Sequence, residues 1–364
     1  MKRLIEYGAV THLALILMVF GCNGTTEACL GARPLSMGGA FVAVADDIHS
    51  CYWNPAGMGN LQGIELTYMQ TLNNKAVINY QNWAAGGIKI GNGGIGASHV
   101  KEINQYLSIY GTDTEGTYQH TYYSNDDWMT LSMGGWGTGA FENTAMGVNI
   151  RRYSHALEKR DDFRLWENGK TTREGLGREA EVNGYDIGFL HKLSDKITLG
   201  LLIQDVNEPR YSFNKDVYVC DMGHAFEGLP TNSECPVCLK KYDQHVNVEK
   251  YSCYRRHARN FRPGIAWMPD EDTIIALDIY YFNVKDAYDN EMQSEVRIGV
   301  EKWLTDRLSV RAGFYGKSMH TIGFGLRSKP VEGSTAPNML YQIDYGLLES
   351  DGGGTHLLSA TVKF

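Results

Sequence analysis

Across its 364 residues, the sequence has no internal apolar stretch long enough to form a membrane-spanning helix. Basic residues are outnumbered by acidic ones, 34 to 42, and no long basic stripe occurs. Nucleic acid is therefore excluded as the expected partner. Proline is scarce, with 9 residues, whereas glycine (41) and tyrosine (22) are abundant. This balance favours many strands joined by tight turns over a disordered chain.

The sequence also lacks a recognisable catalytic motif. Its 11 histidines are scattered, and none stands in a Ser/His/Asp arrangement. We expect these side chains to lie on the surface or in a lumen. The protein is therefore predicted not to be an enzyme.

The first residues have the composition of a secretory signal peptide. Lys2 and Arg3 precede the apolar run AVTHLALILMVFG, and small and polar residues follow. We expect a signal peptide at 1–21 and export of the remaining chain. Two alternatives stay open for Cys22, namely lipidation of this cysteine or simple cleavage nearby.

From residue 62 onward, apolar side chains recur at every second position. Examples are KITLGLLIQDV, EVRIGVEKW, RLSVRAGFY and TIGFGLR. A period of two predicts β-strands and not helices. About fourteen such segments begin near residues 62, 77, 93, 126, 141, 181, 195, 260, 272, 295, 306, 320, 339 and 355.

The polar face of these segments is rich in glycine and carries isolated charges. Such a face suits the inside of a closed barrel, with the apolar face toward lipid. We predict an all-β fold, a transmembrane antiparallel β-barrel of about 14 strands over residues 62–364. The lumen arginines either meet a carboxylate ligand or pair internally, and pairing is favoured because unpaired buried charge is costly. The candidate lumen residues are Asp278, Arg297, Glu301, Arg311, Arg327 and Asp344.

The connections between the segments alternate in length. Tight turns such as GNGG, LSDK and LTDR interleave with long connections, which favours a periplasmic side for the turns and an outer side for the long loops. The stretches Tyr106–Tyr123 and RRYSHALEKRDDFR are expected to be exposed loops. The last segment, THLLSATVKF, ends in an aromatic residue and resembles the assembly signal of outer-membrane barrels.

The segment before the first strand, GARPLSMGGAFVAVADDIHSCYWNPAGMGNL, has a glycine-rich opening and an Asn-Pro-Ala-Gly turn. It resembles the N-terminal hatch of FadL-type long-chain fatty-acid channels and of the related PorV/PorQ-type outer-membrane proteins. The resemblance implies a hatch at 22–61 that plugs a fourteen-stranded barrel in the bacterial outer membrane. The residues that match the hatch motif and would hold its fold are Gly38, Gly39, Asp46, Asp47, Asn54, Pro55 and Ala56.

The resemblance leaves two functions open. FadL-type members carry fatty acids or aromatic hydrocarbons, which implies binding or transport of hydrophobic small molecules and an apolar pocket beneath the long loops. PorV-type members serve protein secretion or surface assembly, which implies secretion-system partners. Outer-membrane lipid is the expected surrounding in both cases.

Residues 207–259 form the longest gap between strands and contain a cysteine-rich knuckle, expected in an extracellular loop. Cys235-Pro-Val-Cys238 resembles the second knuckle of rubredoxin-like and zinc-ribbon sites, and the first knuckle lacks one cysteine. One structural zinc or iron is expected there, with two disulfides as the open alternative and no other cofactor. The two possible ligand sets are Cys220, His224, Cys235, Cys238 and Cys220, Cys235, Cys238, Cys253.

Overall fold

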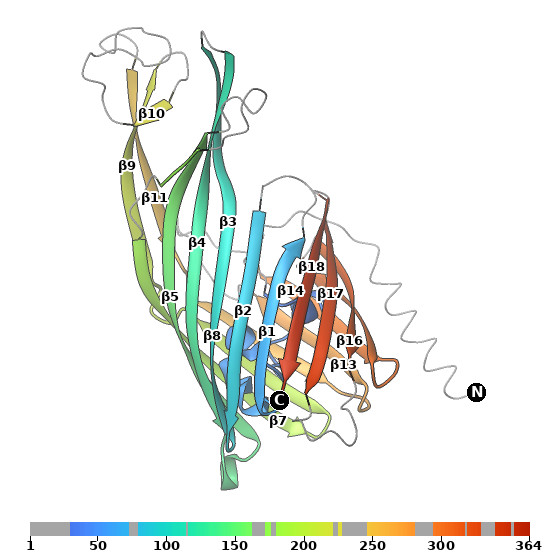
Figure 1. Ribbon diagram of the computed structural model, residues 1–364. Helices are drawn as coiled ribbons and strands as arrows, with labels where there is room; N and C mark the ends of the chain where they lie inside the picture. The colour runs from blue at the N-terminus through green and yellow to red at the C-terminus, as the bar shows by residue number, and fades with distance from the viewer. Residues whose placement is uncertain are drawn as a thin grey trace.

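The computed structural model shows antiparallel strands around a mostly irregular N-terminal segment (Figure 1). The predicted signal peptide lies outside the described residues. The described residues are 30–72, 79–113, 116–161, 172–175, 180–220, 225–227, 246–280, 294–316, 319–328, 339–350 and 353–364.

Of the fifteen strands in the main sheet, fourteen form a closed wall in the described part of the chain. Each strand runs antiparallel to the next one along the wall. The wall strands are β1 (Ile64–Leu72), β2 (Asn79–Ile90), β3 (Gly93–Asp113), β4 (Gly116–Trp136), β5 (Thr144–Asp161), β7 (Ala180–Ser194), β8 (Ile197–Gln204), β12 (Asn260–Trp267), β13 (Thr273–Tyr280), β14 (Glu295–Trp303), β15 (Leu308–Tyr315), β16 (Met319–Arg327), β17 (Leu340–Ser350) and β18 (Gly353–Lys363).

The first and last wall strands meet and complete the ring. Glu65 of β1 is paired with Lys363 of β18, and β4 is paired with β5 on the other side. The fifteenth strand, β6 (Thr172–Gly175), adds only to the edge of β5 among the described residues. The predicted fourteen-stranded antiparallel barrel is therefore confirmed.

Two stretches expected to be loops are instead strand. The tyrosine-rich stretch Tyr106–Tyr123 lies mostly in β3 and β4, and 151–161 completes β5. A long antiparallel hairpin satisfies its own backbone hydrogen bonds, so it needs no apolar alternation to form. Since β3 and β4 have 21 residues each, against about 10 needed to cross a bilayer, they extend well beyond their neighbours (Figure 1).

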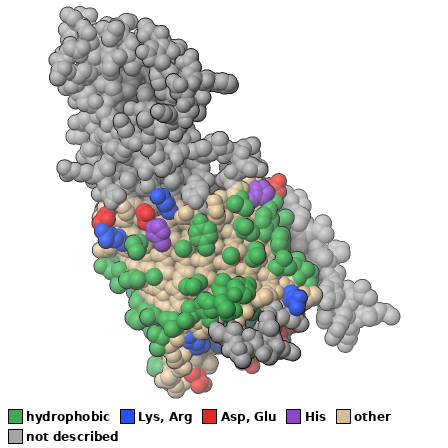
Figure 2. All heavy atoms as spheres, in the orientation of Figure 1, with side chains coloured by type: hydrophobic (Ala, Val, Ile, Leu, Met, Phe, Trp, Pro, Cys, Tyr) green, Lys and Arg blue, Asp and Glu red, His purple; other side chains and the backbone are tan. Residues whose placement is uncertain are grey.

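Side chains of the wall alternate between outside and inside. On β4, Met129, Leu131 and Met133 are 59%, 62% and 58% exposed, whereas Thr130 and Ser132 between them are buried. Figure 2 shows hydrophobic side chains spread over the visible face of the described wall, with charged and histidine side chains toward its borders. The outer surface is thus apolar, as contact with hydrocarbon requires.

The N-terminal segment, residues 30–61, fills the inside of this wall. Its short helices are α2 (Ala32–Ser36), α3 (Ser50–Trp53) and the 3₁₀ helix η2 (Pro55–Asn60), and they contact β3, β4, β5 and β7 on one side and β15 to β18 on the other. A second 3₁₀ helix, η3 (Gly139–Phe141), lies in the β4–β5 connection. The main buried hydrophobic side chains belong to the segment itself: Leu30, Leu35, Met37, Phe41, Ile48, Trp53, Met58 and Leu61.

A second sheet forms within 207–259. It consists of β9 (Arg210–Cys220), β10 (Ala225–Glu227) and β11 (Val246–Arg256), with β9 in the middle. This ribbon stands at the end of the molecule away from the C-terminus (Figure 1). Among the described residues, no helix combines the length and the apolar character needed to cross a bilayer.

Candidate functional site

The best-defined candidate site is the contact between the N-terminal segment and the wall. The turn from Asn54 to Met58 lies against a row of four glycines, one each from β3, β4, β5 and β7, that are paired side by side across these strands. A Cβ atom on any of them would overlap the carbonyl groups of Pro55 or Met58 or the Asn54 side chain. Only glycine allows this close approach of two backbones. This glycine row consists of Gly94, Gly134, Gly147 and Gly188.

The Asn54 side chain fixes the turn that rests on the glycine row. Its Nδ2 donates to the carbonyl oxygens of Val42 (2.9 Å) and Phe189 (3.0 Å), and its Oδ1 accepts from the Ala56 amide (3.1 Å). Asn54 is fully buried. The Asn-Pro-Ala stretch therefore joins the segment to itself and to β7 through one side chain.

Gly38 and Gly39 place the segment against the opposite wall. Both have positive φ angles, 65° and 71°, which side chains rarely adopt. A Cβ on Gly38 would overlap the backbone of Phe314 in β15, and one on Gly39 would press on the rings of Tyr315 and Trp53. These two glycines let the chain turn where no side chain has room.

Arg33 is the centre of a buried ion cluster between the segment and β14. Its guanidinium donates to both carboxylate oxygens of Glu301, at 2.9 and 2.8 Å. It also donates to Asp46 (2.6 and 3.0 Å) and to Asp47 (2.7 Å). Bidentate, charge-assisted contacts of this kind are the strongest that a guanidinium makes. Arg33 thereby binds the Asp46–Asp47 loop and the barrel wall at once.

The cluster continues along the wall through Arg311. Its Nε donates to Glu301 at 2.5 Å and its Nη1 donates to Asp344 at 2.8 Å, and all three side chains are fully buried. Two arginines, Arg33 and Arg311, thus meet four carboxylates, those of Asp46, Asp47, Glu301 and Asp344.

The other candidate lumen residues lie apart from this cluster. Asp278 accepts the amides of Phe41 and Val42 at 2.7 and 2.8 Å, so it holds the segment through backbone contacts. Arg297 stacks on the rings of Tyr280 and Tyr315, with its guanidinium carbon 3.3 and 3.7 Å from the ring centres.

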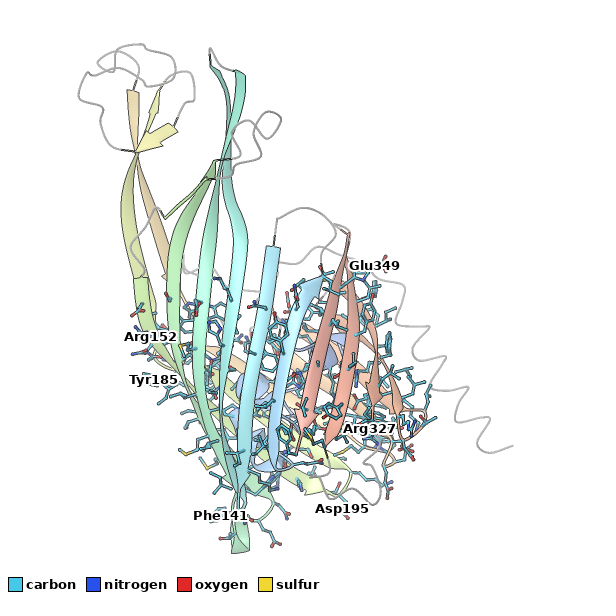
Figure 3. The ribbon with its side chains drawn as sticks, viewed as in Figure 1. Phe141, Arg152, Tyr185, Asp195, Arg327 and Glu349 are labelled. Carbon is cyan, nitrogen blue, oxygen red and sulfur yellow. The ribbon has the colours of Figure 1, made fainter. Side chains whose placement is uncertain are left out.

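Arg327 is not part of the buried interior. It lies at the end of β16, where its guanidinium carbon is 4.0 Å from the ring centre of Trp303 and its Nε donates to the Asp306 carbonyl at 2.5 Å. In Figure 3, Arg327 lies toward the lower part of the barrel, as Asp195 does.

Asp47 is a buried carboxyl with a strongly shifted pKa. Burial by itself would raise the pKa of this carboxyl, but His49 and the Arg33 guanidinium lower it well below its ordinary value. The His49 Nδ1 lies 2.7 Å from Asp47 Oδ1. Cys51, nearby in the chain, is a free and buried thiol whose pKa is raised to about 12 by burial. It is therefore protonated and unreactive at neutral pH.

A cavity of about 850 Å³ opens at the end of the barrel with the short turns. Four of its lining residues are Arg33 and its three carboxylate partners, so the ion cluster closes the cavity on one side. The pocket expected beneath the long connections falls largely outside the described residues. The other lining residues are Gln62, Asp195, Lys196, Met268, Pro269, Asp270, Glu271, Asp272, Ile274, Trp303, Arg327, Leu340, Gln342 and Lys363.

The pairing of β9 with β11 limits which of the predicted metal ligands can bind the same ion. Cys220 is paired with Val246 and Cys253 with Phe213, so the two cysteine positions stand seven residues apart along the ribbon. At about 3.3 Å per residue they are roughly 23 Å apart, too far to share one ion or one disulfide. The ligand set containing both is therefore disfavoured. His224, Cys235 and Cys238 lie outside the described residues, and those described contain no group of three metal-ligating side chains.

Sequence reasoning missed the role of Arg33. The residue stands in the quoted Gly-Ala-Arg motif, but its partner Glu301 is 268 positions away. The available signal was that Arg33 is the only lysine or arginine between 30 and 61, a segment that also contains Asp46 and Asp47. A charge buried in such a segment requires a partner on the wall.

No protein-family model matches the chain, and no curated protein does. Solved structures do match. The toluene transporter TodX of Pseudomonas putida superposes with a TM-score of 0.57 at 12% identity, covering 94% of this chain and 98% of that one. The toluene transporter TbuX of Ralstonia pickettii gives 0.55 at 11% identity, covering 92% and 97%.

A third match is the CymD monoaromatic hydrocarbon channel, with a TM-score of 0.56 at 10% identity, covering 94% of this chain and 99% of that one. At such low identity these matches establish the fold alone. The resemblance to hydrocarbon-transporting barrels that the hatch motif predicted is therefore confirmed at the level of the fold, over nearly the whole of each chain.

Proposed function

We propose that this protein is a FadL-type barrel of the bacterial outer membrane that binds and passes small hydrophobic molecules. The observation that carries the proposal is the full-length fold match to proteins described as toluene transporters and a monoaromatic hydrocarbon channel. The exposed apolar wall supports a membrane location, because such a surface would be unfavourable in water.

Under this proposal, residues 30–61 act as the hatch. The segment fills the lumen and contacts both sides of the wall, so any passage through the barrel has to get past it. Side chains such as those of Asn54 and Arg33 attach the segment to the wall. The segment is therefore a separate body inside the barrel and not a continuation of the sheet.

Uptake by cells that lack hydrocarbon channels of their own tests the proposal. The full chain is expressed in the outer membrane, and entry of toluene and of dodecanoate is compared with entry into cells that carry an unrelated barrel. Faster entry of at least one probe is expected. Equal rates for both probes in the two strains would overturn the proposal.

The secretion-type alternative is distinguished by what stays bound to the barrel. Native mass spectrometry after gentle extraction should show an adduct with the mass of a small hydrophobic molecule. A co-purifying protein partner without such an adduct would favour the PorV/PorQ-type role. The three matched structures described above are two toluene transporters and a monoaromatic hydrocarbon channel, which supports the transport role.

A further inference from the structure

The cavity at the short-turn end meets the N-terminal segment at a group of charged residues. Where it meets the N-terminal segment, its boundary is Arg33 with Asp46, Asp47 and Glu301. Behind this boundary the side chains of Glu301 and Arg311 are completely buried. Moving a boundary made of ion pairs breaks no hydrogen bond of the strand ladder, whereas opening the wall would break many.

This boundary can have two distinct arrangements, one with Arg33 bound to its carboxylate partners and one with Arg33 withdrawn from them. With Arg33 in place, three carboxylates converge on one guanidinium. Without it, Glu301 keeps its contact with Arg311 (2.5 Å) and Asp47 keeps its contact with His49 (2.7 Å), but the Arg33 bridge that joins the Asp46–Asp47 loop to β14 is gone. Withdrawal of Arg33 therefore removes this ionic connection between the loop and the wall while Glu301 and Asp47 each retain a basic partner.

The loop on the segment side is also strained. Ala45, directly before Asp46, has a φ angle of 24°, a region that residues with a Cβ rarely adopt. Backbone strain of this kind persists only where surrounding contacts hold it. Ala45 itself is held by its amide, which donates to the Phe41 carbonyl at 3.0 Å, and by its carbonyl, which accepts from Asn60 Nδ2 at 2.9 Å. The Arg33 contacts to Asp46 and Asp47 hold the two residues that follow.

We propose that Arg33 is the latch of a gate between the barrel interior and the 850 Å³ cavity. In the closed state Arg33 binds Glu301. In the open state α2 and the Asp46–Asp47 loop separate from β14 and β17, while Pro55 stays on the glycine row. This inference rests on the proposed function, since a gate requires a molecule that passes.

A disulfide that fixes α2 to the wall tests the latch. The Cβ of Ser36 is 3.5 Å from the position that a Cβ on Gly346 of β17 would occupy, which is within the span of a disulfide. The double variant Ser36→Cys/Gly346→Cys is made in the full chain, and peptide mapping verifies the 36–346 bridge. Probe entry into cells is then measured before and after addition of a reductant.

Entry through the oxidised variant should be lost and should return on reduction. Unchanged entry through the oxidised, verified bridge would overturn the latch while leaving the proposed function intact. Absence of entry through the natural chain would instead defeat the proposed function itself.

Substitution of the latch residue gives an independent result. Arg33→Ala should speed entry of the probes, because the closed state loses its contact with Glu301. Arg152→Ala removes an arginine from an exposed pair with Glu181 on the outer wall and should leave entry unchanged. If both variants behave like the natural chain while folding normally, Arg33 is a structural residue and not a latch.

Discussion

Arg33 and Glu301, 268 positions apart in the sequence, are joined by two parallel hydrogen bonds inside the barrel. The pair couples an irregular N-terminal segment to a regular wall strand. Its stability contribution follows from burial, because the Glu301 carboxylate has no access to water that would replace its partner.

Removal of Arg33 should therefore destabilise the fold far more than removal of an exposed arginine. Breaking a buried ion pair on one side costs roughly 3–5 kcal/mol, whereas a surface pair contributes about 0–1 kcal/mol. Arg33→Ala and Arg152→Ala are compared by their urea midpoints of unfolding in detergent micelles. A midpoint for Arg33→Ala equal to that of Arg152→Ala would contradict this assignment.

An added methyl group in the glycine row should be poorly tolerated. Gly134→Ala places a Cβ against the Pro55 carbonyl, and overpacking of this kind costs about 1–3 kcal/mol or more where backbone cannot move. Gly354→Ala in β18 is the matched control, because its Cβ would meet only the end of the Leu347 side chain at 3.1 Å and a carbonyl at 4.0 Å. Only the first variant should lower the urea midpoint clearly, and equal midpoints would refute the close contact.

Acid should weaken the attachment of the segment through Asp47. Its pKa is lowered in the folded state, so the ionised form contributes stability above the unfolded value of about 3.9. That contribution is lost as the pH falls through the folded pKa. The urea midpoint of the natural chain should therefore fall between pH 5 and pH 2, and Asp47→Asn should fall less. Parallel pH profiles of the two proteins would show that Asp47 is not responsible.

The cysteine knuckle should bind one zinc ion through Cys220, His224, Cys235 and Cys238. Zinc per chain, measured by elemental analysis of the purified full chain, should be lost in Cys235→Ser and kept in Cys253→Ser, because the ribbon register separates Cys253 from Cys220. A chain without metal, and with the mass deficit of disulfide bridges in its intact mass, would reject the zinc site in favour of the disulfides.

The barrel was predictable because its signal is local. Alternation along a strand such as EVRIGVEKW already separates Val296 from Arg297, and the structure leaves the first 47% exposed and the second 1%. The same alternation could not find the upper part of β4, since residues 116–127 are glycine, tyrosine or polar. In β3 a register shift between Gln105 and Leu107 interrupts the pattern.

The contacts of the N-terminal segment could not be predicted from the sequence for a different reason. An irregular chain has no period, so nothing in the sequence around Arg33 selects Glu301 over another buried carboxylate such as Asp278. Likewise, the glycine-rich faces indicated a lumen, but only the register across four strands shows that Gly94, Gly134, Gly147 and Gly188 form one row.

The glycine row also constrains the order of biogenesis. The segment packs directly on Gly147 on one side of the barrel and on Gly299 of β14 on the other, where an added Cβ would overlap it. We therefore expect the wall to close around a segment already in position, because entry into a finished ring would have to pass these contacts. Because β1 and β18 are the terminal wall strands and pair with each other, their joining is the step that encloses it. Deletion of residues 30–61 should therefore impair assembly of the barrel before it affects permeability.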